Sequence, residues 1–174
     1  SILHGRLEKI RLLASNKNLN AIIDSIPESI LIIDTQHRII GWNKAMESLT
    51  GRSSEEMMNT GKETYSPLFQ GKPGNLLANV VINPDLHHPH ANLVKQHGRA
   101  LMVEGWIHVS GKIPGKYLSS VAAPVLQEDG SIFAAIETVR DNSILKEVEE
   151  ALRTSEEKYR ILVENTKDII FTLN

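Results

Sequence analysis

The order of regular segments between Ser29 and Asp141 constrains the fold of this chain most strongly. Two short apolar runs come first, separated by a polar turn, and together they predict a β-hairpin (29–34 and 38–42). A stretch of short helical patterns follows, and then come three strand-like runs (101–109, 116–126 and 132–139). Two strands, short helices and three strands predict an α+β fold, with a five-stranded antiparallel sheet that carries short helices on one face.

Helical periodicity flanks this core on both sides. Apolar residues recur at helical spacing from Leu3 to Asp24, and Pro27 ends that pattern. Beyond Asp141, apolar residues step by three and four positions in a heptad seam, which contains Leu145, Val148, Leu152 and Tyr159. A helix of this type does not bury its seam alone, so we expect a parallel homodimer through the flanking helices. Packing of the same helix on its own sheet stays open as the alternative.

A sequence repeat begins near the end of the chain. Residues 22–34 align without gaps to residues 162–174, with the same pattern of apolar pairs, an acidic residue and a β-rich run. This predicts four parts: a coupling helix (1–18), a sensory domain (19–141), a coiled-coil linker (142–161) and the truncated start of a second such domain (162–174). Because the chain starts at Ser1 without an initiator Met, we expect it to be a piece of a longer protein.

Composition excludes several classes of function. The chain has no Cys, which rules out disulfides, thiolate nucleophiles and cysteine-ligated clusters. A net charge of −2 and 5% aromatic residues give no basic field or stacking platform for nucleic acid. No run approaches the about 20 apolar residues of a membrane span, so we expect no membrane insertion by this fragment and a cytoplasmic location. No phosphate loop or nucleophile–base spacing indicates an enzyme.

Several motifs together resemble the PAS family of sensory modules. They are, in order, the apolar strand 30–34, the run 40–45 (Ile-Gly-Trp-Asn-Lys-Ala), residues 49–51 with the acidic pair that follows, and the late strand 134–141. Residues 155–160 resemble the linker between consecutive modules in prokaryotic sensor kinases. The resemblance implies a two-component sensory or relay module, which passes a conformational change to an output domain such as a histidine kinase in the parent chain. Its exit motif falls on Asp141 and Ser143, which we expect to cap the next helix and couple it to the sheet.

The family often holds a small ligand between the inner face of the sheet and the short helices. The side chains that we expect around such an unknown ligand are mostly apolar: Met46, Leu49, Met57, Phe69, Leu77, Val81, Val103, Ile107, Tyr117, Ser119, Val121 and Ile136. Most of these positions are also what an ordinary core needs. A ligand-free dimerisation or spacer module is therefore the alternative function.

Four histidines (His87, His88, His90 and His97) form the most conspicuous polar cluster. Imidazoles bind zinc or haem, but these residues follow Pro84 in a polar loop, and only Asp85 is near as a further ligand. We therefore predict no metal site and no firmly implied cofactor, with a haem- or flavin-bearing redox or gas sensor as a further alternative. The light-sensing flavin branch of the family needs an adduct-forming cysteine, which this chain lacks.

Overall fold

The structure is a computed structural model that describes residues 19–70, 74–107, 109 and 115–172, with side chains described as far as Glu164. It divides into two compact units, one that ends at Arg140 and one that begins at Asp141, and each is described by itself. The first unit is α+β, as the sequence predicts.

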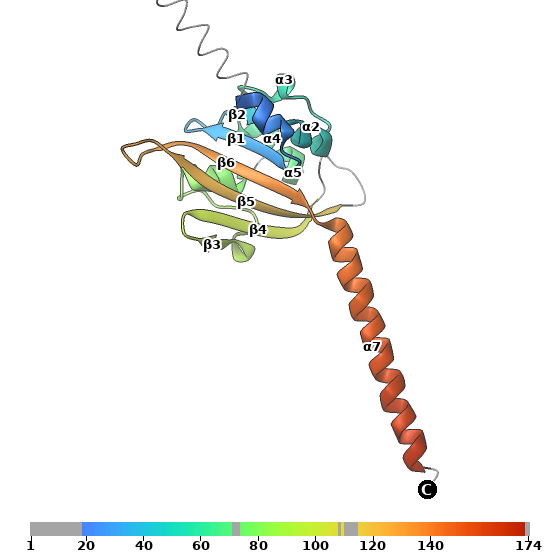
Figure 1. The fold of residues 1–174 in the computed structure, drawn as a ribbon. Helices are drawn as coiled ribbons and strands as arrows, with labels where there is room; N and C mark the ends of the chain where they lie inside the picture. Colours follow the sequence, from blue (N-terminus) through green and yellow to red (C-terminus); the bar gives the residue numbers. More distant parts are fainter. Residues whose placement is uncertain (1–18, 71–73, 108, 110–114, 173–174) are drawn as a thin grey trace, which may run out of the picture. The chain divides into compact units, whose positions relative to one another are not determined.

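The first unit is built on a six-stranded antiparallel sheet (Figure 1). Its strands, in spatial order, are β2 (Ile39–Trp42), β1 (Ser29–Asp34), β6 (Ile132–Asp141), β5 (Lys116–Leu126), β4 (Ala100–Ile107) and β3 (Lys95–His97). The last two strands of the chain therefore lie between the first hairpin and β4. This order brings the early apolar strand β1 against the late strand β6, with Leu31 opposite Glu137.

The expected number of five strands is wrong by one, because β3 was not anticipated. This strand has only three residues, all exposed, and it pairs with β4 through a turn in which Gly98 has a φ of 59°. Its polar sequence carries no alternation of apolar and polar residues, so nothing in the pattern distinguishes it from the loop around it.

Five short α-helices and one 3₁₀ helix connect the strands. They are α2 (Lys44–Thr50), α3 (Ser54–Met57), α4 (Lys62–Tyr65), α5 (Pro67–Gln70), α6 (Leu77–Ile82) and η1 (Ala91–Leu93), and residues 19–25 are helical as well. Gly51 ends α2 with a φ of 73°, a conformation that suits glycine, and its N–H bonds to Glu47 O at 2.7 Å. Ser53 and Glu56 form a capping box at the start of α3, where the sequence indicates a helix N-terminus.

Alternating residues of the strands supply the core. On β5, Leu118, Ser120 and Ala122 are buried, whereas the alternating residues Tyr117, Ser119 and Val121 are partly exposed. Helix α6 contacts β1, β4 and β5 from the buried side. Tyr65 and Asn79 on this side are fully buried and bonded to each other, with 2.6 Å between Tyr65 Oη and Asn79 Nδ2.

The second unit is helix α7 (Ser143–Thr172). The Asp141 carboxylate accepts hydrogen bonds from the backbone N–H (3.1 Å) and the hydroxyl (2.6 Å) of Ser143, as expected of a residue that starts a helix. The helix includes the residues in which the sequence indicates the start of another domain, and that division stays a prediction. None of the described helices is both long enough and apolar enough to cross a bilayer.

Candidate ligand-binding site

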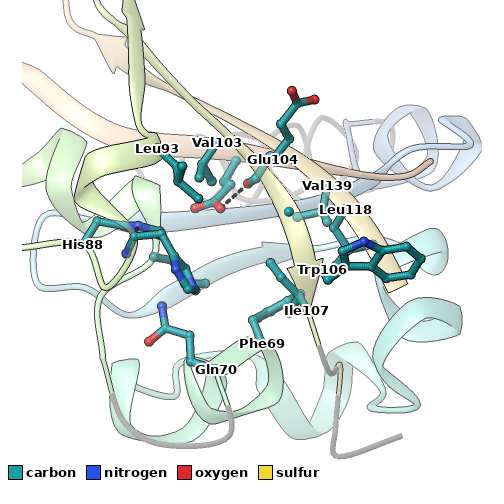
Figure 2. A pocket seen from close by; sticks show the side chains of 15 residues that line it. Phe69, Gln70, His88, Leu93, Val103, Glu104, Trp106, Ile107, Leu118 and Val139 are labelled. Atoms are coloured by element: carbon teal, nitrogen blue, oxygen red, sulfur yellow. Dashed lines mark hydrogen bonds between the residues drawn. The ribbon is translucent and has the colours of Figure 1, made fainter. Parts of the chain in front are cut away.

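A cavity of about 120 Å³ lies between the inner face of the sheet and the segment from α5 to η1 (Figure 2). Its walls are largely apolar, with side chains from α5, the residue that precedes α6, the 3₁₀ helix and three neighbouring strands: Phe69, Leu76, Leu93, Val103, Ile107, Leu118 and Val139. A space of this size and lining suits a compact small molecule.

The carboxyl group of Glu137 is the most deeply buried polar group at the cavity. Its side chain accepts a hydrogen bond from the Ala78 backbone N–H at 2.8 Å and another from the Ser120 hydroxyl (dashed in Figure 2). Only 3% of the residue is exposed, and this burial raises the pKa of Glu137, although both hydrogen bonds act in the opposite direction. Strands β5 and β6 and helix α6 therefore meet at one carboxyl group.

His88 supplies a neutral imidazole to the same cavity. Burial, with a smaller contribution from the neighbouring His90 and His87, lowers the pKa of His88 to about 4. Its Nδ1 accepts the backbone N–H of His90 at 3.1 Å, so the neutral ring carries its hydrogen on Nε2. The ring is therefore a hydrogen-bond donor without charge at neutral pH.

Gln70 completes the polar lining. Its Nε2 donates to the backbone oxygen of Asn75 at 3.0 Å, while its buried Oε1 has no hydrogen-bond partner among the residues that the structure describes. Gly74 lies directly against this amide, because a Cβ atom there would be 1.9 Å from Gln70 Oε1. A buried acceptor without a partner costs free energy.

The structure places the residues predicted from sequence in three groups. Phe69, Val103 and Ile107 line the cavity. A second group belongs to the apolar core without lining the cavity: Met46, Leu49, Met57, Leu77 and Val81. The third group lies on the opposite face of the sheet: Tyr117, Ser119, Val121 and Ile136.

On that opposite face, Tyr117 packs edge-on against Trp106 with ring centroids 5.6 Å apart. Trp106 is 52% exposed.

Sequence reasoning missed Gln70, His88, Ser120 and Glu137 as cavity residues. For the two strand residues a signal existed, because Ser120 alternates with Leu118 and Ala122, and Glu137 with Ala135 and Val139. The sequence favours a polar surface loop for the histidine cluster, so His88 was not expected in a cavity wall. Among the described residues, no group of three or more His, Cys, Asp or Glu side chains is placed to hold a metal ion.

Several known proteins resemble this chain in sequence or in structure. The family described as the PAS fold matches residues 17–62. The PAS domain of Bordetella pertussis BvgS is similar, with 14% identity and a TM-score of 0.51 over 82% of this chain and 98% of that one. A PAS domain from Colwellia psychrerythraea shares 19% identity and has a TM-score of 0.50, over 74% of this chain and 97% of its own.

A third solved structure, an RNA-binding light-oxygen-voltage receptor, has 16% identity and a TM-score of 0.53; the match covers 82% of this chain and 37% of that one. No curated protein sequence matches the chain. These solved structures resemble the chain in fold. The first unit therefore has the PAS fold, whose family model matches residues 17–62.

Proposed function

We propose that this PAS domain binds a small molecule in the cavity beside Glu137 and passes a conformational change through helix α7 to an output domain of the parent protein. The observation that carries the proposal is the cavity itself, which combines apolar walls with a buried carboxyl group and the neutral ring of His88. A pocket of this composition is the usual form of a ligand site. A core that only served as a spacer would fill the space with side chains.

The connection from site to output runs along one strand. Glu137 lies on β6, and that strand ends at Asp141, which accepts the hydrogen bonds of Ser143 at the start of α7. A ligand that interacts differently with two arrangements of β6 shifts the balance between them. The residues after β6 then carry that difference into the helix.

Helix α7 has the surface of a dimerising element. Its seam side chains Leu145, Val148, Leu152 and Tyr159 are 59%, 60%, 60% and 70% exposed, respectively. Exposed apolar residues at heptad spacing gain free energy when a second helix covers them. We therefore propose a parallel homodimer, with a histidine kinase as the type of output domain that suits such a linker.

Native mass spectrometry of the whole chain as purified tests the proposal, by comparison with its denatured mass and its absorbance spectrum. We expect a dimer that releases a small molecule on denaturation. A Val103→Phe variant, which fills the cavity, should lose that mass, whereas Met102→Phe on the exposed side of β4 should keep it.

Retention of the bound mass in Val103→Phe would place the ligand elsewhere. A dimer without any bound mass, in which added small molecules also fail to bind, would favour the spacer function. A visible absorbance band would favour the haem or flavin alternative.

A further inference from the structure

A buried hydrogen-bond network joins the turn between β1 and β2 to helices α4 and α6. At its centre is the side-chain amide of Asn79 on α6, a residue with no exposed surface. Its Nδ2 lies 2.6 Å from the hydroxyl oxygen of Tyr65 on α4 and 3.1 Å from Nδ1 of His37 in the turn. These three residues lie outside the lining of the cavity beside Glu137.

The partners in this network determine which atom carries each hydrogen. The Oδ1 of Asn79 accepts the backbone N–H of Leu76 at 2.9 Å, which fixes the orientation of the amide and leaves its Nδ2 facing the other two side chains. The Tyr65 hydroxyl donates its single hydrogen to the backbone oxygen of His37 at 3.2 Å, and therefore accepts from Asn79. The second hydrogen of the Asn79 amide then goes to His37, so Nδ1 of that ring is an acceptor. The imidazole is therefore neutral, with its hydrogen on Nε2.

The turn holds the His37 ring in this position. His37 has a φ of 60°, in the left-handed region that few residues other than Gly, Asn, Asp and His adopt. The Asp34 carboxylate stabilises this conformation, because it accepts the backbone N–H groups of Gln36 (2.9 Å) and Arg38 (2.8 Å) on either side of His37. The His37 N–H donates to the backbone oxygen of Asp34 at 3.0 Å. Since His37 is partly exposed, its ring can exchange a proton with water.

The charged groups near His37 lie on the turn, on β1 and on α4. Burial lowers the pKa of His37 below 6.5, and Lys62 on α4 lowers it as well, whereas Asp34 at the end of β1 acts in the opposite direction. Arg38 forms an ion pair with Asp34, with 3.0 Å between Nη2 and Oδ2. Burial raises the pKa of Tyr65, which therefore keeps its hydroxyl hydrogen, and α6 has no titratable side chain. His37 is thus neutral at pH 7.5 and takes up its proton below pH 6.5.

A proton on Nδ1 of His37 would reverse the role of this atom in the network. Two donors would then face each other, and the buried Asn79 amide would lose an acceptor unless α6 or the turn moved. Asn79 is next to Ala78, whose backbone N–H bonds to Glu137. The start of α6 is therefore held by the turn through Asn79 and by β6 through Ala78.

We propose that the contact between His37 and Asn79 is a pH-sensitive switch, in which the uptake of a proton by His37 frees α6 from the turn between β1 and β2. The inference goes beyond the proposed function, because the contact forms without a ligand. It makes pH a second input to the helix that is bonded to Glu137.

NMR spectra of the whole chain test the chemical part of this inference. Proton–nitrogen correlation spectra of the histidine rings should show His37 with a hydrogen on Nε2 and none on Nδ1 at pH 7.5. As the pH falls to 5, the ring of His37 and the side-chain amide of Asn79 should change with one common midpoint below 6.5. A hydrogen on Nδ1 at pH 7.5, or an Asn79 amide that stays unchanged while the ring takes up its proton, would overturn the inference.

Amide hydrogen exchange at residues 79–81 tests whether the helix responds. His37→Asn is the comparison, because Asn tolerates the left-handed region and its Oδ1 stands in the position of the imidazole Nδ1 without taking up a proton. The ratio of the exchange rates, unaltered chain over His37→Asn, should rise about fivefold between pH 7.5 and pH 5. The same ratio taken with His97→Asn, at an exposed position, should stay constant.

A ratio with His37→Asn that is the same at both pH values would mean that α6 does not respond to the proton, and would overturn the inference. Where His37→Asn does not fold, the titration of the Asn79 amide in the unaltered chain decides the point. Neither measurement needs a ligand, so either result leaves the proposed ligand binding in place.

Discussion

Asn43 holds together the start of α2, the start of β1 and the segment before it, and its replacement gives the sharpest test of how this fold is stabilised. Its Oδ1 accepts the backbone N–H groups of Met46 (3.0 Å) and Ile30 (2.9 Å). Its Nδ2 lies 2.8–3.3 Å from three backbone oxygens, those of Ile23, Ile26 and Glu28. The residue is only 1% exposed, so water does not replace these partners when the side chain is removed.

The expected cost of Asn43→Ala follows from these contacts. Loss of the N-cap costs about 1 kcal/mol. Each buried backbone group that loses its partner adds about 1–3 kcal/mol, and the Ile30 N–H is one such group. We therefore expect the free energy of unfolding to fall by about 3–5 kcal/mol, a large part of the roughly 5–15 kcal/mol typical of a domain.

Asn43→Asp separates the two halves of this role. Aspartate is an equally good N-cap, but it presents an oxygen to the three backbone oxygens that the Asn43 amide now contacts. We expect it to cost about 2 kcal/mol or more despite its matching shape. Ser53→Ala, which removes the exposed cap of α3, should cost only about 1 kcal/mol and is the control.

Urea unfolding followed by tryptophan fluorescence measures all three variants, because Trp42 is buried and donates to Arg52 O at 3.1 Å. The midpoints should shift while the slopes stay the same. If Asn43→Ala costs no more than Ser53→Ala, the buried hydrogen bonds contribute little and the reasoning is refuted.

Three further predictions concern pH and assembly. The pKa of His88 is lowered from 6.5 to about 4, so this residue is protonated in the unfolded chain at a higher pH than in the folded chain. The free energy of unfolding, measured with urea, should therefore fall by about 2 kcal/mol as the pH drops through this range. His88→Gln should remove this loss, whereas His97→Gln at an exposed position should not. Burial raises the pKa of Glu137, so the folded chain binds the proton of this carboxyl group more tightly than the unfolded chain and loses stability as the pH rises above 4.5. The free energy of unfolding of Glu137→Gln, relative to that of the unaltered chain, should therefore increase with pH. A difference between the two that does not change with pH would contradict this prediction. Leu152→Glu on the seam of α7 should turn a dimer into a monomer in light scattering, whereas Glu149→Gln should not; a dimer that survives Leu152→Glu would show that α7 does not hold it together.

Local signals predict much of this fold because each acts over a few residues. The left-handed turn at Gly51 and the capping box at Ser53 depend on neighbours within four positions, and both form where the sequence indicates. Strand alternation is equally local, and it would have placed Ser120 on the buried face with Leu118. The extra strand β3 lacks such a signal, since it forms only because β4 is available to pair with it.

The chemistry of the cavity depends on contacts over long sequence separations, which no local pattern encodes. Glu137 meets Ser120 across 17 positions and Ala78 across 59. Only the sheet order, which puts β5 and β6 side by side beneath α6, turns three ordinary residues into one buried polar site. Glu137 lies in a strand near the end of the domain, and from the sequence alone nothing distinguishes it from the other acidic residues of the chain.

Under the proposed function, the same long-range contacts would link ligand binding to signalling in this domain. A ligand whose polar group bonds to Glu137 competes with the Ala78 N–H, and thus with the bond that ties α6 to β6. Loss of that bond leaves a buried backbone donor at the start of α6 without a partner, unless the helix moves or the ligand accepts from it. We therefore expect the free energy of binding by such a ligand to depend on the position of α6 and of the strand that ends at Asp141, which is the differential interaction that a two-state relay requires.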